Sequence, residues 1–345
     1  MELTLPLPEF PFPSVISPYA AQAEEHLRGW ARSRRIVAPG AAADAFDSML
    51  FGRFAARVYA DAEYGRLLTL ADWTGWIFAF DDLLDDTPEG RDAEFVERVI
   101  ACMEPVCRGR RTLRRPPAPS REVARSRDAL ARLRRRITRA MPAEWNARFT
   151  RNVVDFLHSY RRQASVNGSR AVLDEAAYSA HRSSTVAMYT GADLIEYGTG
   201  RPVPEHLLAR PEVAALRESA VNAIGWTNDL FSAPKEISVG DLCNYVTVLH
   251  RQLGVPLEEA AREVVMRIDA EVKRFCEAAA AVRDLCRGLP DDQARALLGT
   301  VDGLGHWMAG HAAWSRETGR YRSHAVPDGR ELLEATGRAP GGPHA

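Results

Sequence analysis

The sequence has few lysines, no long apolar run and no paired cysteines. Lys235 and Lys273 are the only lysines, so arginine carries nearly all of the positive charge. No stretch reaches about 18 uninterrupted apolar residues, and residues 1–10 lack the basic and hydrophobic regions of a signal peptide. We therefore expect a cytoplasmic protein without stable membrane association. The five cysteines lack the CxxC spacing of a zinc site, and the formal net charge of −1 argues against a nucleic-acid partner.

Helix-forming residues dominate from Ala21 onward, and strand-like alternation is rare. Several helical segments are separated by proline or glycine, as at Pro39-Gly40 and Pro116-Pro117. The predicted helices span residues 21–35, 44–60, 62–82, 92–104, 121–140, 143–166, 173–197, 211–235, 241–253, 257–288 and 291–317. Consecutive helices with short breaks predict one all-α domain over residues 21–322.

Both ends of the chain differ from this domain, and one internal segment is strongly basic. Residues 1–20 are rich in proline and are predicted to be extended, either as an ordered strap or as a disordered terminus. Residues 323–345 are rich in glycine and proline and are predicted to be a flexible tail. In the basic segment 108–139, Leu130, Leu133 and Ile137 recur at helical spacing. This pattern favours an amphipathic helix with a solvated arginine face over a nucleic-acid-binding arm.

The stretch WIFAFDDLLDD, residues 76–86, joins an aromatic run to a cluster of carboxylates. In a helix, Asp81 and Asp85 project from one face, with Asp82 beside them. Such a face can bind a divalent cation, because hard oxygen ligands favour Mg²⁺. The motif alone leaves open a solvated acidic helix end.

A second oxygen-rich stretch, NDLFSAPKE, covers residues 228–236. Asn228, Ser232 and Glu236 fall at i, i+4 and i+8 on one helical stripe, which predicts a second metal site. Pro234 removes a backbone donor within this motif and is expected to kink or loosen the helix, which makes the register of Glu236 less secure. Asp229 points away from the stripe and is predicted to be a supporting or structural acid.

The ordered pair of DDLLD and NDxxSxxKE resembles the class I terpene synthases, particularly the single-domain bacterial terpene cyclases, and most closely their sesquiterpene synthases. The resemblance implies a helical bundle around a central active-site cavity. It also implies Mg²⁺ as the cofactor, with three ions when diphosphate is bound and with Mn²⁺ as a substitute. Asp81, Asp82, Asp85, Asn228, Ser232 and Glu236 are then the expected metal ligands, of which Asp81, Asn228, Ser232 and Glu236 count as catalytic.

The same resemblance implies residues that bind diphosphate. Arg182 lies 46 positions before Asn228 (228 − 182), where the family places an arginine that senses diphosphate. The positions that follow in the family, often an acidic linker and a glycine, read Thr185 and Val186 here, which leaves that relay open. Arg320 and Tyr321 resemble the family's diphosphate clamp, and Lys235 is expected to bind diphosphate as well. Arg182, Arg320 and Tyr321 also count among the expected catalytic residues.

Aromatic side chains are expected to line an apolar cavity in which a carbocation is protected from water. Family position favours Phe54, Phe78 and Trp314. Ordinary core packing remains open for each of these rings, as it does for Phe80, Trp226 and Trp307.

The resemblance therefore implies a Mg²⁺-dependent lyase that ionises and cyclises a linear isoprenyl diphosphate and releases diphosphate. Farnesyl diphosphate is the favoured substrate, and geranyl or geranylgeranyl diphosphate remains an alternative. A trans-prenyltransferase is less favoured because the second motif is NDLFSAPKE rather than aspartate-rich, and a non-enzymatic helical scaffold would not explain the ordered motifs. The product skeleton and the oligomeric state, including a homodimer, stay open.

Overall fold

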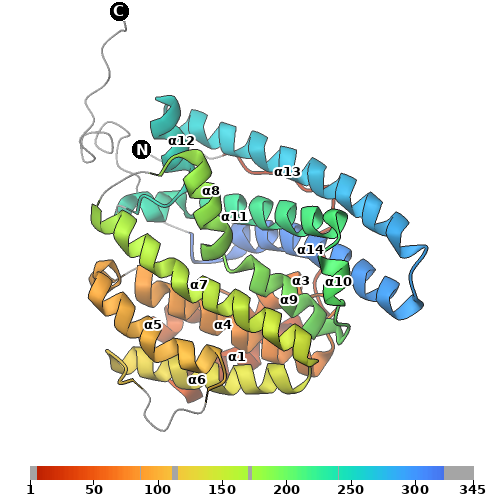
Figure 1. Cartoon of the computed structure of the whole chain (residues 1–345). Coiled ribbons are helices and arrows are strands. Elements are labelled where there is room, and N and C mark those ends of the chain that lie inside the picture. Colours follow the sequence, from red (N-terminus) through yellow and green to blue (C-terminus); the bar gives the residue numbers. More distant parts are fainter. Residues whose placement is uncertain (1–5, 86, 111–115, 170–172, 240, 322–345) are drawn as a thin grey trace, which may run out of the picture.

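The computed structural model in Figure 1 describes residues 6–85, 87–110, 116–169, 173–239 and 241–321. Within these ranges every regular element is a helix, which confirms the predicted all-α fold. In chain order the elements are α1 (Ala20–Arg34), α2 (Ala41–Ser48), α3 (Phe51–Val58), α4 (Tyr64–Asp85), the 3-10 helix η1 (Pro88–Arg91), α5 (Ala93–Cys107), α6 (Arg121–Arg139), α7 (Ala143–Ser169), α8 (Glu175–Thr185), α9 (Met188–Thr199), α10 (Glu205–Leu208), α11 (Pro211–Val239), α12 (Tyr245–Leu253), α13 (Leu257–Cys286) and α14 (Asp291–Glu317).

Two helices organise the bundle (Figure 1). α4 packs against α1, α3, α6 and α9, whereas α11 packs against α8, α9, α12, α13 and α14. Apolar residues occur on all sides of α4, as expected for a helix enclosed by others, and Leu67, Trp76 and Phe80 are buried. α9 contacts both α4 and α11 and therefore joins the two halves of the bundle.

The segment predicted as one helix over residues 44–60 is two helices, α2 and α3. The chain turns at Leu50, which has a left-handed backbone with a φ of 57°. Phe46 and Phe51 are buried on either side of the turn, and their rings contact edge to face at 5.3 Å. The apolar pattern continues across the turn, and the one glycine of the segment, Gly52, lies inside α3 rather than at the turn, so the sequence does not mark the break at Leu50.

The segment predicted as one helix over residues 173–197 is also divided, into α8 and α9. Ala187 adopts a left-handed backbone with a φ of 56° between them. As a result, Arg182 lies on α8, whereas Tyr189, predicted to share its helix, lies on α9.

Pro234 does not interrupt its helix. α11 continues from Pro211 to Val239 and includes Pro234 in its interior. The predicted loosening at this position is therefore not seen as a break, and the residues that follow Pro234 stay helical.

The N-terminal segment lies along the helices, from residue 6 onward. The ring of Phe12 contacts Phe275 at 5.4 Å, and the guanidinium of Arg316 donates to the carbonyl of Pro8 at 3.4 Å. The backbone N–H of Ser17 donates to Ala56 at 2.8 Å. These contacts are compatible with a strap, which stays a prediction; residues 1–5 and the predicted tail lie outside the described residues.

The basic segment forms α6 in its second half. Leu130, Leu133 and Ile137 are buried, and Arg132 and Arg135 are exposed, so the helix has the predicted amphipathic character. Residues 111–115 of this segment lie outside the described ranges. Among the helices that the structure describes, none is long and apolar enough to span a membrane.

Candidate active site

A cavity of about 1150 Å³, open mouth included, lies between α4 and α11. Along α4 its lining changes from Trp73 and Phe78 to Asp81 and Asp85. Along α11 it changes in the same direction, from an apolar residue to the polar stripe and lysine of the second motif: Ile224, Asn228, Ser232, Lys235 and Glu236. The C-terminal turns of both helices therefore carry oxygen ligands to one end of an otherwise largely apolar hollow.

Two carboxylates of the first motif are held by α7. Tyr160 donates its hydroxyl to Asp81 Oδ1 at 2.8 Å, and Gln163 donates to Asp85 Oδ1 at 3.1 Å. Burial raises the pKa of Asp81, while the neighbouring Arg320 opposes that rise. α7 thus fixes the rotamers of both side chains and compensates part of their desolvation.

Asp82 faces a different set of partners. Arg320 donates to its two carboxylate oxygens at 2.9 and 2.6 Å, and Lys235 Nζ lies 3.5 Å from Oδ1. Burial would lower the pKa of Arg320, but Asp82 raises it well above its usual value. These ion pairs join α4, α11 and the segment after α14. Lys235 and Arg320 line the cavity, whereas Asp82 is not among its lining residues.

The second motif forms the predicted stripe on α11. Ser232 Oγ is buried and has no hydrogen-bond partner among the described residues. Glu236 Oε2 accepts a hydrogen bond from Asn244 at 2.8 Å. An unpartnered hydroxyl beside an amide and a carboxylate is a donor set that a hard divalent cation would complete.

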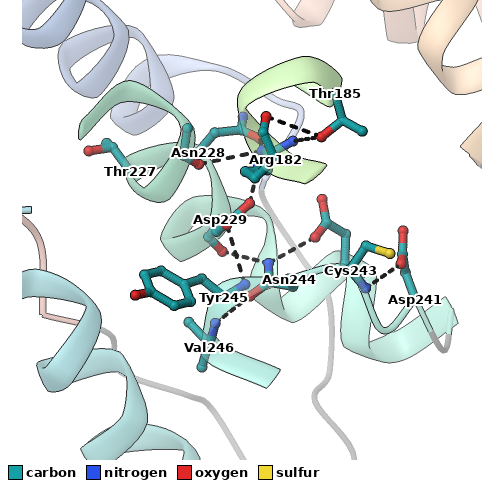
Figure 2. A network of polar contacts seen from close by, with 12 residues as sticks. Arg182, Thr185, Thr227, Asn228, Asp229, Asp241, Cys243, Asn244, Tyr245 and Val246 are labelled. Carbon is teal, nitrogen blue, oxygen red and sulfur yellow. Dashed lines mark hydrogen bonds and ion pairs between the residues drawn. The ribbon is translucent and has the colours of Figure 1, made fainter. Parts of the chain in front are cut away.

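Arg182 connects this stripe to α8 (Figure 2). It donates to Asn228 Oδ1 at 2.7 Å and forms an ion pair with Asp229 at 2.8 Å. Thr185 accepts a weaker hydrogen bond from Arg182 at 3.4 Å, and the chain turns just after it, at Ala187. The relay positions of the family thus coincide with a helix break, and the left-handed residue is alanine.

Asp229 is fully buried and joins three elements, consistent with the supporting role predicted for it. Besides Arg182, it accepts hydrogen bonds from the backbone N–H of Tyr245 at 3.3 Å and from the hydroxyl of Tyr178. Burial raises the pKa of Asp229 well above its usual range, and the charge of Glu236 adds to the rise.

The predicted clamp residues also reach the stripe and the cavity rings. Asn228 Nδ2 donates to the hydroxyl of Tyr321 at 3.0 Å. The guanidinium of Arg320 lies over the ring of Phe78, 5.0 Å from its centroid. Arg182, Lys235, Arg320 and Tyr321 therefore all line the same cavity, although they come from three segments of the chain.

Three predicted rings occupy different positions. Phe54 and Phe78 line the cavity, and their rings contact edge to face at 5.8 Å. Trp314 was expected to line the cavity as well, but it is not among the lining residues. Its ring stacks on Phe54 at 4.4 Å, and its N–H donates to the carbonyl of Met49 at 2.8 Å, so it supports the wall from behind. Trp307 lines the cavity, whereas Phe80 and Trp226 do not.

Several polar residues of the site were not predicted from the sequence: Tyr160, Gln163, Asp241, Asn244 and His311. They come from other elements than the two motifs. Asn244 had a usable local signal, since asparagine before an apolar run is a common helix cap, and the other four had none. Asn244 caps α12, and the helix predicted over residues 241–253 accordingly begins at Tyr245.

The donor chemistry fits a divalent metal, although the described residues contain no ready group of three His, Cys, Asp or Glu side chains for one. Asp82 is paired with Arg320, and two of the three residues on the α11 stripe are an asparagine and a serine. All six predicted ligands offer oxygen, which suits Mg²⁺ or Mn²⁺ better than a softer metal.

Comparison with known proteins gives the same class of protein as the resemblance of the two sequence motifs. Residues 72–274 match the model of Terpene synthase family 2, C-terminal metal binding. The chain is 29% identical to 10-epi-cubebol synthase of Sorangium cellulosum, over 93% of this chain and 98% of that protein. It is 30% identical to the (+)-T-muurolol synthase of Roseiflexus castenholzii, described as (2E,6E)-farnesyl diphosphate cyclizing, over 90% of this chain and 92% of that protein. A solved variant of cucumene synthase superposes with a TM-score of 0.80, at 28% identity over 91% of this chain and all of that one.

The fold and site define a class I terpene synthase, a lyase with a divalent-metal site. The chain belongs to terpene synthase family 2.

Proposed function

We propose that this protein binds farnesyl diphosphate, breaks its carbon–oxygen bond and cyclises the C15 chain to a sesquiterpene. The observation that carries the proposal is the pair of oxygen-rich turns at the ends of α4 and α11, beside a cavity lined by Phe54, Phe78 and Trp307. The Roseiflexus relative, a farnesyl diphosphate-cyclizing synthase, supports the choice of substrate.

The proposed metal ligands are the six oxygen-bearing residues of the two motifs: Asp81, Asp82, Asp85, Asn228, Ser232 and Glu236. They would hold Mg²⁺, with three ions in the diphosphate complex and Mn²⁺ as a substitute. Bound divalent cations neutralise negative charge on the diphosphate and so make it a better leaving group.

The chain's own cations provide the remaining stabilisation. When the carbon–oxygen bond breaks, its electron pair leaves with the diphosphate, and N–H and O–H donors must meet the growing charge. Arg182, Lys235, Arg320 and Tyr321 line the cavity and are proposed to donate to it. Arg320 is held by Asp82 and Arg182 by Asn228, so these donors would exchange protein oxygens for diphosphate oxygens.

The apolar part of the cavity would fold the allylic cation and exclude water. The faces of Phe54 and Phe78 offer cation–π stabilisation, worth about 0.5 to 2 kcal/mol per ring. The reaction ends in one of two ways. The last carbocation loses a proton, and the electron pair of that C–H bond forms the new double bond, or water adds to the carbocation.

The remaining proposals concern the whole chain. They are the division into a strap (residues 1–20), a catalytic domain (21–322) and a tail (323–345), a cytoplasmic location and a homodimer. Light scattering of the purified protein tests whether it is a homodimer.

The proposed activity is tested by incubating the purified protein with geranyl, farnesyl or geranylgeranyl diphosphate and Mg²⁺, and identifying products by mass spectrometry. We expect cyclic C15 products from farnesyl diphosphate and none in excess EDTA. Asp81→Asn should lower kcat by about 100-fold or more, because it removes one ligand charge. Asp302→Asn is the matched control, since that carboxylate lies exposed on α14.

Three results would contradict the proposal. Turnover that continues in excess EDTA would exclude the metal-dependent mechanism. Cyclic products from geranyl or geranylgeranyl diphosphate alone would mean that farnesyl diphosphate is not the substrate. Elongation of the isoprenyl chain would assign a prenyltransferase.

A further inference from the structure

Pro234 lies between the first and last residues of the α11 stripe. Proline has no backbone N–H, so the carbonyl of Leu230, four residues earlier, loses its normal helical donor. The helix nevertheless continues, and Glu236 stays in line with Asn228 and Ser232 on the cavity wall. Something outside α11 must therefore help to keep the last turn in register.

Asn244 contacts α11 on both sides of Pro234. Its side-chain amide donates to the backbone carbonyl of Asp229 at 2.9 Å, as Figure 2 shows, and to the carboxylate of Glu236 at 2.8 Å. The first partner lies five residues before the proline and the second lies two residues after it. Asn244 is fully buried, so its bond to the backbone carbonyl of Asp229 is shielded from solvent, whereas Glu236 is half-buried at the cavity.

The side chain of Asn244 is also held by α12, on the side away from α11. Its oxygen accepts a hydrogen bond from the backbone N–H of Val246 at 2.9 Å and caps α12. The backbone N–H of Asp241 donates to the carbonyl of Glu236 at 2.9 Å, which holds the intervening segment against the end of α11. The amide donors of Asn244 thus approach α11 from a rigid support.

We propose that Asn244 is a positioning residue that holds Glu236 in ligand register with Asn228 across Pro234. The proposal rests on the proposed function, because Glu236 is a ligand only if the site binds divalent metal with diphosphate. It predicts that loss of the Asn244 side chain weakens metal binding strongly when residue 234 is proline and much less when it is alanine.

Asn244→Ser separates positioning from capping. Serine can still cap α12 through its hydroxyl oxygen, but it lacks the two amide donors to Asp229 and Glu236. Asn244→Asp is a second, nearly isosteric variant that also keeps the capping oxygen and loses both donors. Asn146→Ser is the matched control, because the side-chain amide of Asn146 also donates two hydrogen bonds, in its case to the backbone carbonyls of Thr138 and Met141, away from the cavity.

The experiment measures Mn²⁺ binding by electron paramagnetic resonance in the presence of inorganic diphosphate, so it does not depend on turnover. Asn244→Ser should weaken Mn²⁺ binding by about 10- to 100-fold, the usual range for residues that orient a metal ligand. Asn146→Ser should leave it unchanged. Adding Pro234→Ala to Asn244→Ser should restore most of the lost affinity, because alanine returns the backbone donor that holds the turn.

The possible results separate the two proposals. If the unmodified protein binds no Mn²⁺ with diphosphate, the proposed function fails. If it binds Mn²⁺ and both Asn244 variants bind equally well, Asn244 does not position Glu236. If the variants lose affinity and Pro234→Ala restores none of it, the link to Pro234 is wrong. Circular dichroism of each variant shows whether it is folded, and the restored double variant excludes unfolding as the cause.

Discussion

Phe78 has two contacts that bear on different stages of the proposed reaction. Its ring lines the cavity and contacts Phe54, while Arg320 lies over its face. The first contact shapes the space where a carbocation would fold, and the second places the guanidinium that we propose to bind diphosphate. One side chain therefore links the wall of the cavity to its mouth.

We expect Phe78→Ala to keep measurable substrate consumption and to change the product mixture, because the ring acts mainly after ionisation. A fall of kcat by about 10-fold is compatible with losing the cation–π contact to Arg320, which is worth about 0.5 to 2 kcal/mol. Gas chromatography with mass detection of the products gives the measurement.

Phe149→Ala is the control for loss of a buried ring. Phe149 packs on Trp145 in the core and does not line the cavity, so its removal should lower stability without changing the product ratio. An unchanged product ratio in Phe78→Ala would assign that ring to the core.

How far the site could be predicted depends on whether its residues share an element. Asn228, Ser232 and Glu236 share one helix, so the helical period is enough to align them. Asn244 and Tyr160 reach the motifs from other helices, and only the packing of α7 and α12 against the site brings them close. Trp314 was placed by resemblance alone, and its packing behind Phe54 could not be read from its position in the chain.

At the scale of elements, helices were predictable and some of their breaks were not. Proline and glycine mark many ends, but α8 and α9 meet at Ala187, whose left-handed backbone costs about 1–2 kcal/mol. Local sequence does not favour that conformation. The buried neighbours on both sides, Tyr178 and Met188, show that tertiary packing supports it.

α4 also carries a buried carboxylate that faces away from the cavity. Asp72 is fully buried; His26 of α1 lies 2.9 Å from it and Arg136 of α6 lies 3.2 Å from it. Burial raises the pKa of Asp72 to about 7, against the opposing effect of Arg136 and the more distant Arg34. Burial also lowers the pKa of His26, and the charge of Arg136 adds to this effect.

The raised pKa of Asp72 predicts a pH-dependent stability. The pKa of the carboxyl is near 3.8 in the unfolded chain and about 7 in the folded protein, so the folded state binds the extra proton between these values. The contribution is fully present below about pH 4 and is lost as the pH rises to about 7. Asp72→Asn should remove this slope, with a pH-independent offset from the altered contact to Arg136.

Urea unfolding of both proteins between pH 5 and pH 8 measures the difference. The difference in the free energy of unfolding, Asp72→Asn minus the unmodified protein, should increase with pH up to about pH 7 and then level off. A difference that is constant across this range would mean that Asp72 is already ionised at pH 5.

At the scale of the whole molecule, three distant segments meet at one mouth. Asp82 at the end of α4 is held by Lys235 of α11 and by Arg320, which follows α14. The charges of this cluster compensate one another, so adding only a cation or only an anion would disturb the balance. Diphosphate and Mg²⁺ together would supply both signs.

We therefore expect diphosphate and Mg²⁺ to bind cooperatively and to order the mouth. Hydrogen exchange should slow in residues 87–91, 241–244 and 318–321 only when both are present, and peptides from α6 serve as an internal control far from the site. Arg320→Ala should weaken this protection, because it removes the cation that joins the last segment to Asp82. Equal protection with Mg²⁺ alone, or a response confined to α6, would place the anion site elsewhere.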